Sequence, residues 1–291
     1  MSTNPFWCSV GEWRNWQTRD AQNVRGRKPV KVRVLSLLPP NGKISVSRVS
    51  SSVDRRTATT KGGKMPTTEE KKEEMQLKKR WLALWKRIGG KTDGDAEWAE
   101  IVARYAESHR MHHVLLYIEH CLRELDEVKA KRNLLINPDA VEVALWFHDI
   151  VNDTTAEAIS RKDNEKKSAE LWLKIAKKGQ VPEAFRDYVA KLILPTNHSD
   201  PAYGLDGRYV QDIDLAILGR PWREFDDYED QIRFEYSWAS DEDFAKERKE
   251  ILGKFLARPL GIYTTQFFKE KYEMQARRNL KYSIARLSDH L

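Results

Sequence analysis

The sequence predicts an all-α protein whose folded part is a single helical bundle of about eight to ten helices. Two observations lead to this prediction. From residue 67 onward, apolar residues recur every three or four positions, which is the period of an amphipathic helix. In the same part of the chain, no run of strand length alternates between apolar and polar residues. With 291 residues, 40% of them apolar, the chain can also bury a sizeable core.

The expected helices follow one another from Thr67 to the end of the chain. The first begins where Thr67 or Thr68 can cap the helix, has acidic residues in its first turns, and ends at Gly89 and Gly90. Pro138 suits the first turn of a helix that is expected to end at the pair His148 and Asp149. A second helix is expected to begin at Asp95 and to include Tyr105, and a third to run from His112 to about Lys131. Further helices are expected near residues 163–178, 183–194, 208–218, 222–238, 241–256 and 264–287.

Residues 1–64 differ from the remainder in charge and composition. They contain 13 Lys and Arg against 3 Asp and Glu, so their net charge is +10, whereas the remainder has a net charge of −3. They show no sustained helical period and contain turn-forming stretches, which predicts a disordered basic tail. The stretch EWRNWQTRDAQ also looks like a tRNA gene translated in a protein reading frame. On that alternative, residues 1–64 are a gene-annotation artefact and the protein starts at Met65.

Composition argues against several classes of protein and partner. Two cysteines, Cys8 and Cys121, are too few for a disulfide framework, so a reducing, cytoplasmic location is expected. No run of about 18 apolar residues is present, so no membrane partner is expected. The excess positive charge is confined to residues 1–64, so a nucleic-acid partner is not expected for the folded part.

Histidines and aspartates occur in a pattern typical of a metal site. His148 and Asp149 directly follow the apolar run ALWF, where an unpaired charge would be costly. Other members of the pattern lie before and after this pair, at His109, His112, His113, His120, His198, Asp212 and Asp214. Neutral imidazoles and carboxylates on rigid helices can enclose a divalent cation and leave positions open for water. Such a cation lowers the pKa of its bound water and makes hydroxide available near neutral pH.

Five segments, in order and spread over roughly residues 80–290, carry a resemblance to a known family. They are RYAESHRMHH, ALWFHDIVND, DNEKKSAEL, ILPTNH and DIDLAILG. On these segments the chain resembles the HD-domain superfamily of metal-dependent phosphohydrolases, and more closely a group of stand-alone HD phosphohydrolases. The resemblance implies an HD-type helical domain over residues 65–291, with a metal-activated water as nucleophile.

The same resemblance implies roles for individual residues. The implied metal ligands are His113, His148, Asp149 and Asp212. The implied catalytic residues, which position phosphate or orient ligands, are Asp149, His198, Arg110 and Glu165. Because residues two apart on a helix point about 200° away from each other, only one aspartate of the last segment can be a ligand. The family pattern selects Asp212 over Asp214. The set contains no thiolate, so the cation stays open among Mn, Fe, Co, Ni, Mg and Zn.

Tyr117 departs from the family pattern. The group usually has a second histidine at this position, one helical turn after His113. Tyrosine is a poor ligand for a hard divalent cation at neutral pH, because its pKa is near 10. The outer part of the metal site and the substrate pocket therefore differ from the usual arrangement.

The sequence as a whole predicts a metal-dependent phosphohydrolase acting on a small phosphorylated metabolite or nucleotide. Three alternatives stay open. A catalytically degenerate HD domain can serve as a ligand-sensing or interaction module, and Tyr117 gives this idea some weight. A nucleic-acid binder can use the basic tail. A di-iron oxygenase is known among helical HD proteins, although its chemistry needs more ligands. Neither the substrate nor the oligomeric state follows from the sequence.

Overall fold

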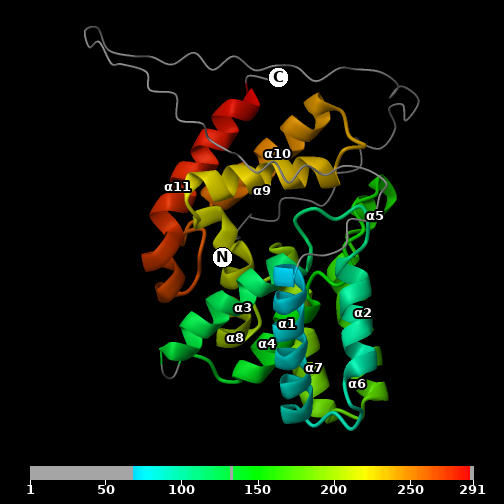
Figure 1. Cartoon of the computed structure of the whole chain (residues 1–291). Helices are drawn as coiled ribbons and strands as arrows, with labels where there is room; N and C mark the ends of the chain where they lie inside the picture. The colour runs from blue at the N-terminus through cyan, green and yellow to red at the C-terminus, as the bar shows by residue number, and fades with distance from the viewer. Residues whose placement is uncertain (1–67, 132–133, 289–291) are drawn as a thin grey trace, which may run out of the picture. The chain divides into compact units, whose positions relative to one another are not determined.

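The computed structural model describes residues 68–131 and 134–288 of the chain. The chain divides into two units, Met1–Thr68 and Glu69–Leu291, and the description below concerns the second. The tail expected over residues 1–64 lies outside the described residues. The described residues form α-helices and short 3₁₀ helices with no strand, so the prediction of an all-α bundle is confirmed (Figure 1).

Eleven α-helices and two 3₁₀ helices make up the described part of the chain. They are α1 (Thr68–Arg87), α2 (Asp95–Tyr105), α3 (Leu115–Ala130), α4 (Pro138–Phe147), α5 (Ala156–Arg161), α6 (Asn164–Lys178), α7 (Glu183–Ile193), η2 (Leu194–Asn197), α8 (Gly204–Asp214), η3 (Leu215–Gly219), α9 (Trp222–Glu235), α10 (Asp241–Leu256) and α11 (Gln266–Ser288). Only α5 has no counterpart among the expected helices. It is six residues long, too short to show a helical period, and the Thr155 hydroxyl caps it by accepting from Ala158 N at 3.3 Å.

Helix α4 lies at the centre of the bundle and contacts α3, α6, α7 and α8 (Figure 1). Every residue from Ala140 to Phe147 is buried, as expected for a helix enclosed on all sides. Two polar residues satisfy its amino end. Asn137 accepts from Ala140 N at 3.1 Å, and Asp206 of α8 accepts from the backbone N–H groups of Ile136 and Asn137 at 2.8 Å. These hydrogen bonds hold the amino end of α4 against α8.

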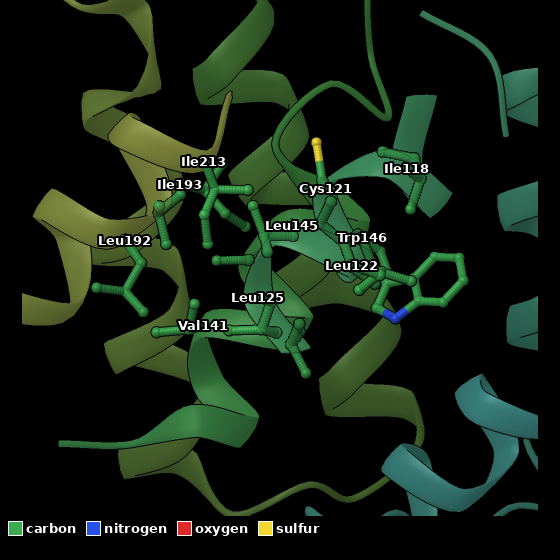
Figure 2. Packing of buried hydrophobic residues seen from close by; sticks show 14 of the residues in the cluster. Ile118, Cys121, Leu122, Leu125, Val141, Leu145, Trp146, Leu192, Ile193 and Ile213 are labelled. Atoms are coloured by element: carbon green, nitrogen blue, oxygen red, sulfur yellow. The ribbon is translucent and has the colours of Figure 1, made fainter. Parts of the chain in front are cut away.

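Apolar side chains of α3, α7 and α8 pack against α4 (Figure 2). Leu145 and Trp146 of α4 pack among residues of α3, α7 and α8 that are at most 2% exposed, namely Ile118, Cys121, Leu122, Leu125, Leu192, Ile193 and Ile213. Burying apolar side chains of this size contributes roughly 1.5–3 kcal/mol each. The packing holds the ends of α4 and α8 together, and these ends carry the residues described in the next subsection.

Glu142 is the one acidic residue in the buried part of α4, and basic side chains of neighbouring helices hold it. Its carboxylate accepts from Arg80 Nε of α1 at 2.7 Å and from Lys129 Nζ of α3, while Arg87 Nη2 lies 3.8 Å away. Burial alone would raise the pKa of Glu142, but Arg80 and Lys129 lower it below its ordinary value overall. These ion pairs tie α4 to α1 and α3.

Glu142→Gln is expected to destabilise the protein, and the loss should be larger at neutral pH than in acid. The folded-state pKa of Glu142 lies below the value of about 4.3 typical of an unfolded glutamate. Its stabilising contribution is therefore present above that value and is lost as the pH falls through the folded-state pKa. We expect a loss of about 1–3 kcal/mol in the free energy of unfolding at neutral pH. Urea denaturation of the wild-type protein and the variant should show a difference in the free energy of unfolding that becomes smaller in acid. A difference that does not change with pH would contradict a stabilising role of the Glu142 carboxylate.

Candidate metal centre

Three side chains bring their donor atoms together at the carboxyl ends of α4 and α8. His148 follows α4 and is fully buried, Asp149 comes next, and Asp214 is the last residue of α8. His148 Nε2 lies 3.1 Å from Asp149 Oδ2 and 3.6 Å from Asp214 Oδ1. One donor atom from each residue lies within 4.8 Å of the other two. These three residues form the donor cluster, whose spacing suits atoms that share one cation.

The His148 ring is oriented so that one nitrogen faces the donor cluster. Its Nδ1 lies 3.0 Å from the carbonyl oxygen of Leu145. This oxygen has no proton to donate, so Nδ1–H is the donor of the hydrogen bond. Nε2 therefore points at both carboxylates, and it offers its lone pair to a cation once its proton is displaced. A hydrogen bond from the far nitrogen is the usual support of a metal-binding histidine.

The charged groups of the donor cluster stabilise one another. Burial lowers the pKa of His148, but Asp149 and Asp214 raise it well above its ordinary value overall. Burial would raise the pKa of both carboxyls, yet His148 lowers that of Asp149, and His148 and His198 hold that of Asp214 well below its usual range. A cation bound here would take over the neutralising role of the His148 proton.

His113 lies beside the donor cluster, and Glu235 at the end of α9 orients it. His113 Nε2 is 3.8 Å from Asp149 Oδ2, and His113 Nδ1 is 2.6 Å from Glu235 Oε2. Glu235 Oε1 also accepts from the backbone N–H groups of residues 111–113, at 2.7–3.0 Å. The Glu235 carboxylate therefore fixes both the backbone and the ring of His113, and it turns Nε2 toward Asp149.

Glu235→Gln is expected to lower the pKa of His113. Burial lowers this pKa, but Glu235 and Asp149 raise it above its ordinary value overall, while the pKa of Glu235 itself falls to about 2. A neutral glutamine does not stabilise the protonated imidazole of His113. Because Glu235 also orients this ring, we expect metal affinity to fall by about 10–100-fold. Histidine ring NMR resonances followed against pH measure the first effect. Glu224→Gln, an exposed change on the same helix, should leave the titration of His113 unaltered; an unaltered titration in Glu235→Gln would contradict the assignment.

Asp212 does not join the donor cluster, and this corrects the expected ligand by two residues. Its carboxylate accepts from the backbone N–H and the hydroxyl of Thr264, at 2.9 and 3.2 Å, and from those of Thr265, at 2.7 and 2.6 Å. Asp212 thus anchors the segment that leads into α11. Asp214 projects from another side of α8 and reaches His148. The candidate ligand is therefore Asp214 in place of Asp212.

Arg110, expected to position phosphate or to orient ligands, binds backbone carbonyl oxygens at the site. Its side chain is fully buried and donates to the carbonyl oxygens of Asp149 at 2.7 Å, Ile150 at 2.9 Å and His113 at 3.2 Å. Its Nε donates to Glu107 at 3.0 Å. The guanidinium satisfies carbonyls just beyond the end of α4 and ties them to the segment that carries His113. Arg110 is thus a positioning residue.

His198 contacts the donor cluster, and Glu165 is close enough for the charge of Asp149 to act on it. His198 Nε2 is 2.6 Å from Asp214 Oδ2, so its N–H donates to that carboxylate and helps to orient it. Glu165 of α6 is partly buried, and its carboxyl has no hydrogen-bond or ion-pair partner on another residue within 68–131 or 134–288. Burial raises the pKa of Glu165, and the negative charge of Asp149 raises it further. These properties suit Glu165 to proton transfer.

Tyr117 lies where the resemblance to the HD superfamily predicts a histidine. Its hydroxyl oxygen is 3.1 Å from His148 Nε2, and the hydroxyl donates a hydrogen bond to Asp214 Oδ1. Burial and the charge of Asp214 raise the pKa of Tyr117 well above its ordinary value. The phenol is therefore neutral in the protein as described, and its single proton is directed at Asp214.

Glu235 is the residue of the site that the sequence reasoning did not identify. It follows Ile232 by three positions and Tyr228 by seven, which places it near the apolar face expected for α9. A glutamate on such a face must find a partner when the face is buried, and its side chain is in fact fully buried. Its position on the apolar face is the sequence signal that could have drawn attention to Glu235, but it does not identify His113 as the partner.

Comparisons with known proteins give no match: no family model, no curated protein and no solved structure is similar to this chain. The assignment to the HD superfamily therefore stays a prediction that rests on five sequence segments. None of the described helices combines the length and the apolar character that a membrane span requires.

Proposed function

We propose that this protein is a metal-dependent hydrolase of phosphate esters, in which His148, Asp149 and Asp214 hold a cation. The observation that carries the proposal is the donor cluster, where a buried imidazole with its proton fixed on the far nitrogen faces two carboxylates. Nitrogen and oxygen donors of this kind suit Mn, Fe, Co, Ni, Mg or Zn. A bound cation would supply hydroxide near neutral pH and polarise a phosphoryl oxygen.

The residues around the donor cluster have separate tasks in this proposal. His113 and His198 orient the carboxylates of Asp149 and Asp214, which they approach to 3.8 and 2.6 Å. Glu165 exchanges a proton with the attacking water or the leaving group, because its raised pKa keeps a protonated fraction at higher pH than usual. The substrate class, a small phosphorylated metabolite or nucleotide, comes from the resemblance to HD phosphohydrolases alone.

A ligand-sensing module is the second candidate function. Two observations favour it: the Tyr117 hydroxyl hydrogen-bonds to donor atoms of the cluster, and the guanidinium of Arg110 is committed to backbone carbonyls. Such a site can bind a cation or a phosphorylated ligand without hydrolysing it.

Hydrolysis assays on the full chain separate these two functions. Metal-stripped protein is loaded at mildly alkaline pH with each of the six cations and assayed for phosphate release from p-nitrophenyl phosphate, nucleotides and sugar phosphates. The proposal expects release with at least one cation, abolished in Asp214→Asn and retained in Glu224→Gln. Cation binding with no release across the panel favours the sensing module, and a chain that binds no cation contradicts both.

A further inference from the structure

The Tyr117 hydroxyl lies among the donor atoms of the cluster. Its oxygen is 3.1 Å from His148 Nε2, the separation that also holds between this nitrogen and Asp149 Oδ2. An octahedral cation with bonds of about 2.1 Å places neighbouring ligands roughly 3 Å apart. Tyr117 Oη is thus as close to His148 Nε2 as a further ligand of the same cation would be.

The surroundings of Tyr117 leave its hydroxyl little freedom to move away. The side chain is buried, with 6% of its surface exposed, and its ring contacts those of His112 and His148 at centroid distances of 4.7 and 5.7 Å. It projects from α3, one helical turn after His113. A cation that binds His148 Nε2 and Asp214 Oδ1 replaces the two hydrogen bonds that the hydroxyl now makes. The hydroxyl oxygen then lies beside that cation.

We propose that Tyr117 is itself a ligand of this centre and adapts it to a trivalent cation, ferric iron in the first place. This inference rests on the proposed function, since it concerns the cation of the same site. A phenol binds a cation tightly only as phenolate: the Oη–H bond breaks, the proton leaves to the buffer, and an Oη–Fe bond forms. A trivalent cation displaces this proton at neutral pH far more readily than a divalent one, and hard oxygen donors suit it.

Visible absorption of the iron-loaded protein tests this role directly. Full-length, metal-stripped protein receives one equivalent of iron(III) as its nitrilotriacetate complex, and bound iron per chain is measured alongside the spectrum. A phenolate ligand gives an intense phenolate-to-iron(III) charge-transfer band in the visible range. We expect this band in the wild-type protein. Tyr117→Phe should still bind iron through the donor cluster, with at least tenfold lower affinity, and should lack the band.

Tyr105→Phe is the matched control, because it removes another buried phenol hydroxyl near the site. The Tyr105 hydroxyl donates to the carbonyl oxygen of Trp146 at 3.0 Å and does not contact the donor cluster, so the band should persist. Wild-type protein that binds iron without the band, or a band that survives in Tyr117→Phe, overturns the inference. Binding of zinc or manganese with no binding of iron overturns the inference alone, while failure to bind any of these ions overturns the proposed function as well.

Discussion

Asp214→Asn is expected to empty the metal centre while the helices stay formed. Asparagine keeps the size of the side chain but removes the negative charge that His148 and His198 face at 3.6 and 2.6 Å. An amide is a weaker ligand for a hard cation, so we expect metal affinity to fall by about 100-fold or more. This exceeds the loss of affinity that is typical when a residue hydrogen-bonded to a metal ligand is removed. Isothermal titration with manganese or zinc measures the affinity, and circular dichroism checks the helices.

Asp212→Asn is the matched control on the same helix. It should retain wild-type metal affinity, because its carboxylate contacts Thr264 and Thr265 and not the donor cluster. The asparagine NH₂ group would face the donors of these two threonines, so we expect the free energy of unfolding to fall by about 1–3 kcal/mol. If Asp212→Asn lost the metal and Asp214→Asn kept it, the ligand assignment would be reversed.

Arg110→Ala is expected to cause the largest loss of stability among changes near the site. It leaves the buried carbonyl oxygens of His113, Asp149 and Ile150 without their donor. We expect the free energy of unfolding to fall by roughly 2–4 kcal/mol, because hydrogen bonds from a charged donor are stronger than neutral ones. The displaced end of α4 should also weaken metal binding by about tenfold. Urea denaturation and metal titration measure the two effects.

Arg104→Ala shows whether this loss belongs to the buried guanidinium. Arg104 is partly exposed and pairs with Glu100 and Glu107 on the surface, so its removal should change the free energy of unfolding by less than about 1 kcal/mol. Equal losses in the Arg104 and Arg110 variants would mean that the backbone carbonyls find other donors.

The helices were predictable where an amphipathic period runs for three turns or more. Helix α10 begins and ends at the residues expected from the sequence, and α2 and α4 begin at the expected residues. Helix α8 begins at Gly204, four residues earlier than expected, in a stretch whose two glycines look like a turn. Asp206, in its first turn, accepts from two backbone N–H groups before α4 and from the Tyr188 hydroxyl at 2.9 Å. A contact between distant segments thus extends this helix, and no local pattern reveals such a contact.

The site was only partly predictable, for the same reason. The buried His148 and its neighbour Asp149 followed from an ionisable pair after an apolar run, and the structure places them together. The choice between Asp212 and Asp214 depends on which side of α8 faces α4, and both aspartates lie in a buried stretch of similar composition. Thr264 and Thr265, some fifty residues further along the chain, donate hydrogen bonds to the Asp212 carboxylate and so leave Asp214 on the side of α8 that faces His148.

Anomalous diffraction from crystals of the full chain soaked in manganese tests the central claim most directly, since it locates a cation without any assumption about the reaction. We expect one anomalous peak within bonding distance of His148 Nε2 and of carboxylate oxygens of Asp149 and Asp214, and no such peak in Asp214→Asn. Wild-type crystals with no peak at this place, or with a cation held by Asp212 instead, would contradict the account.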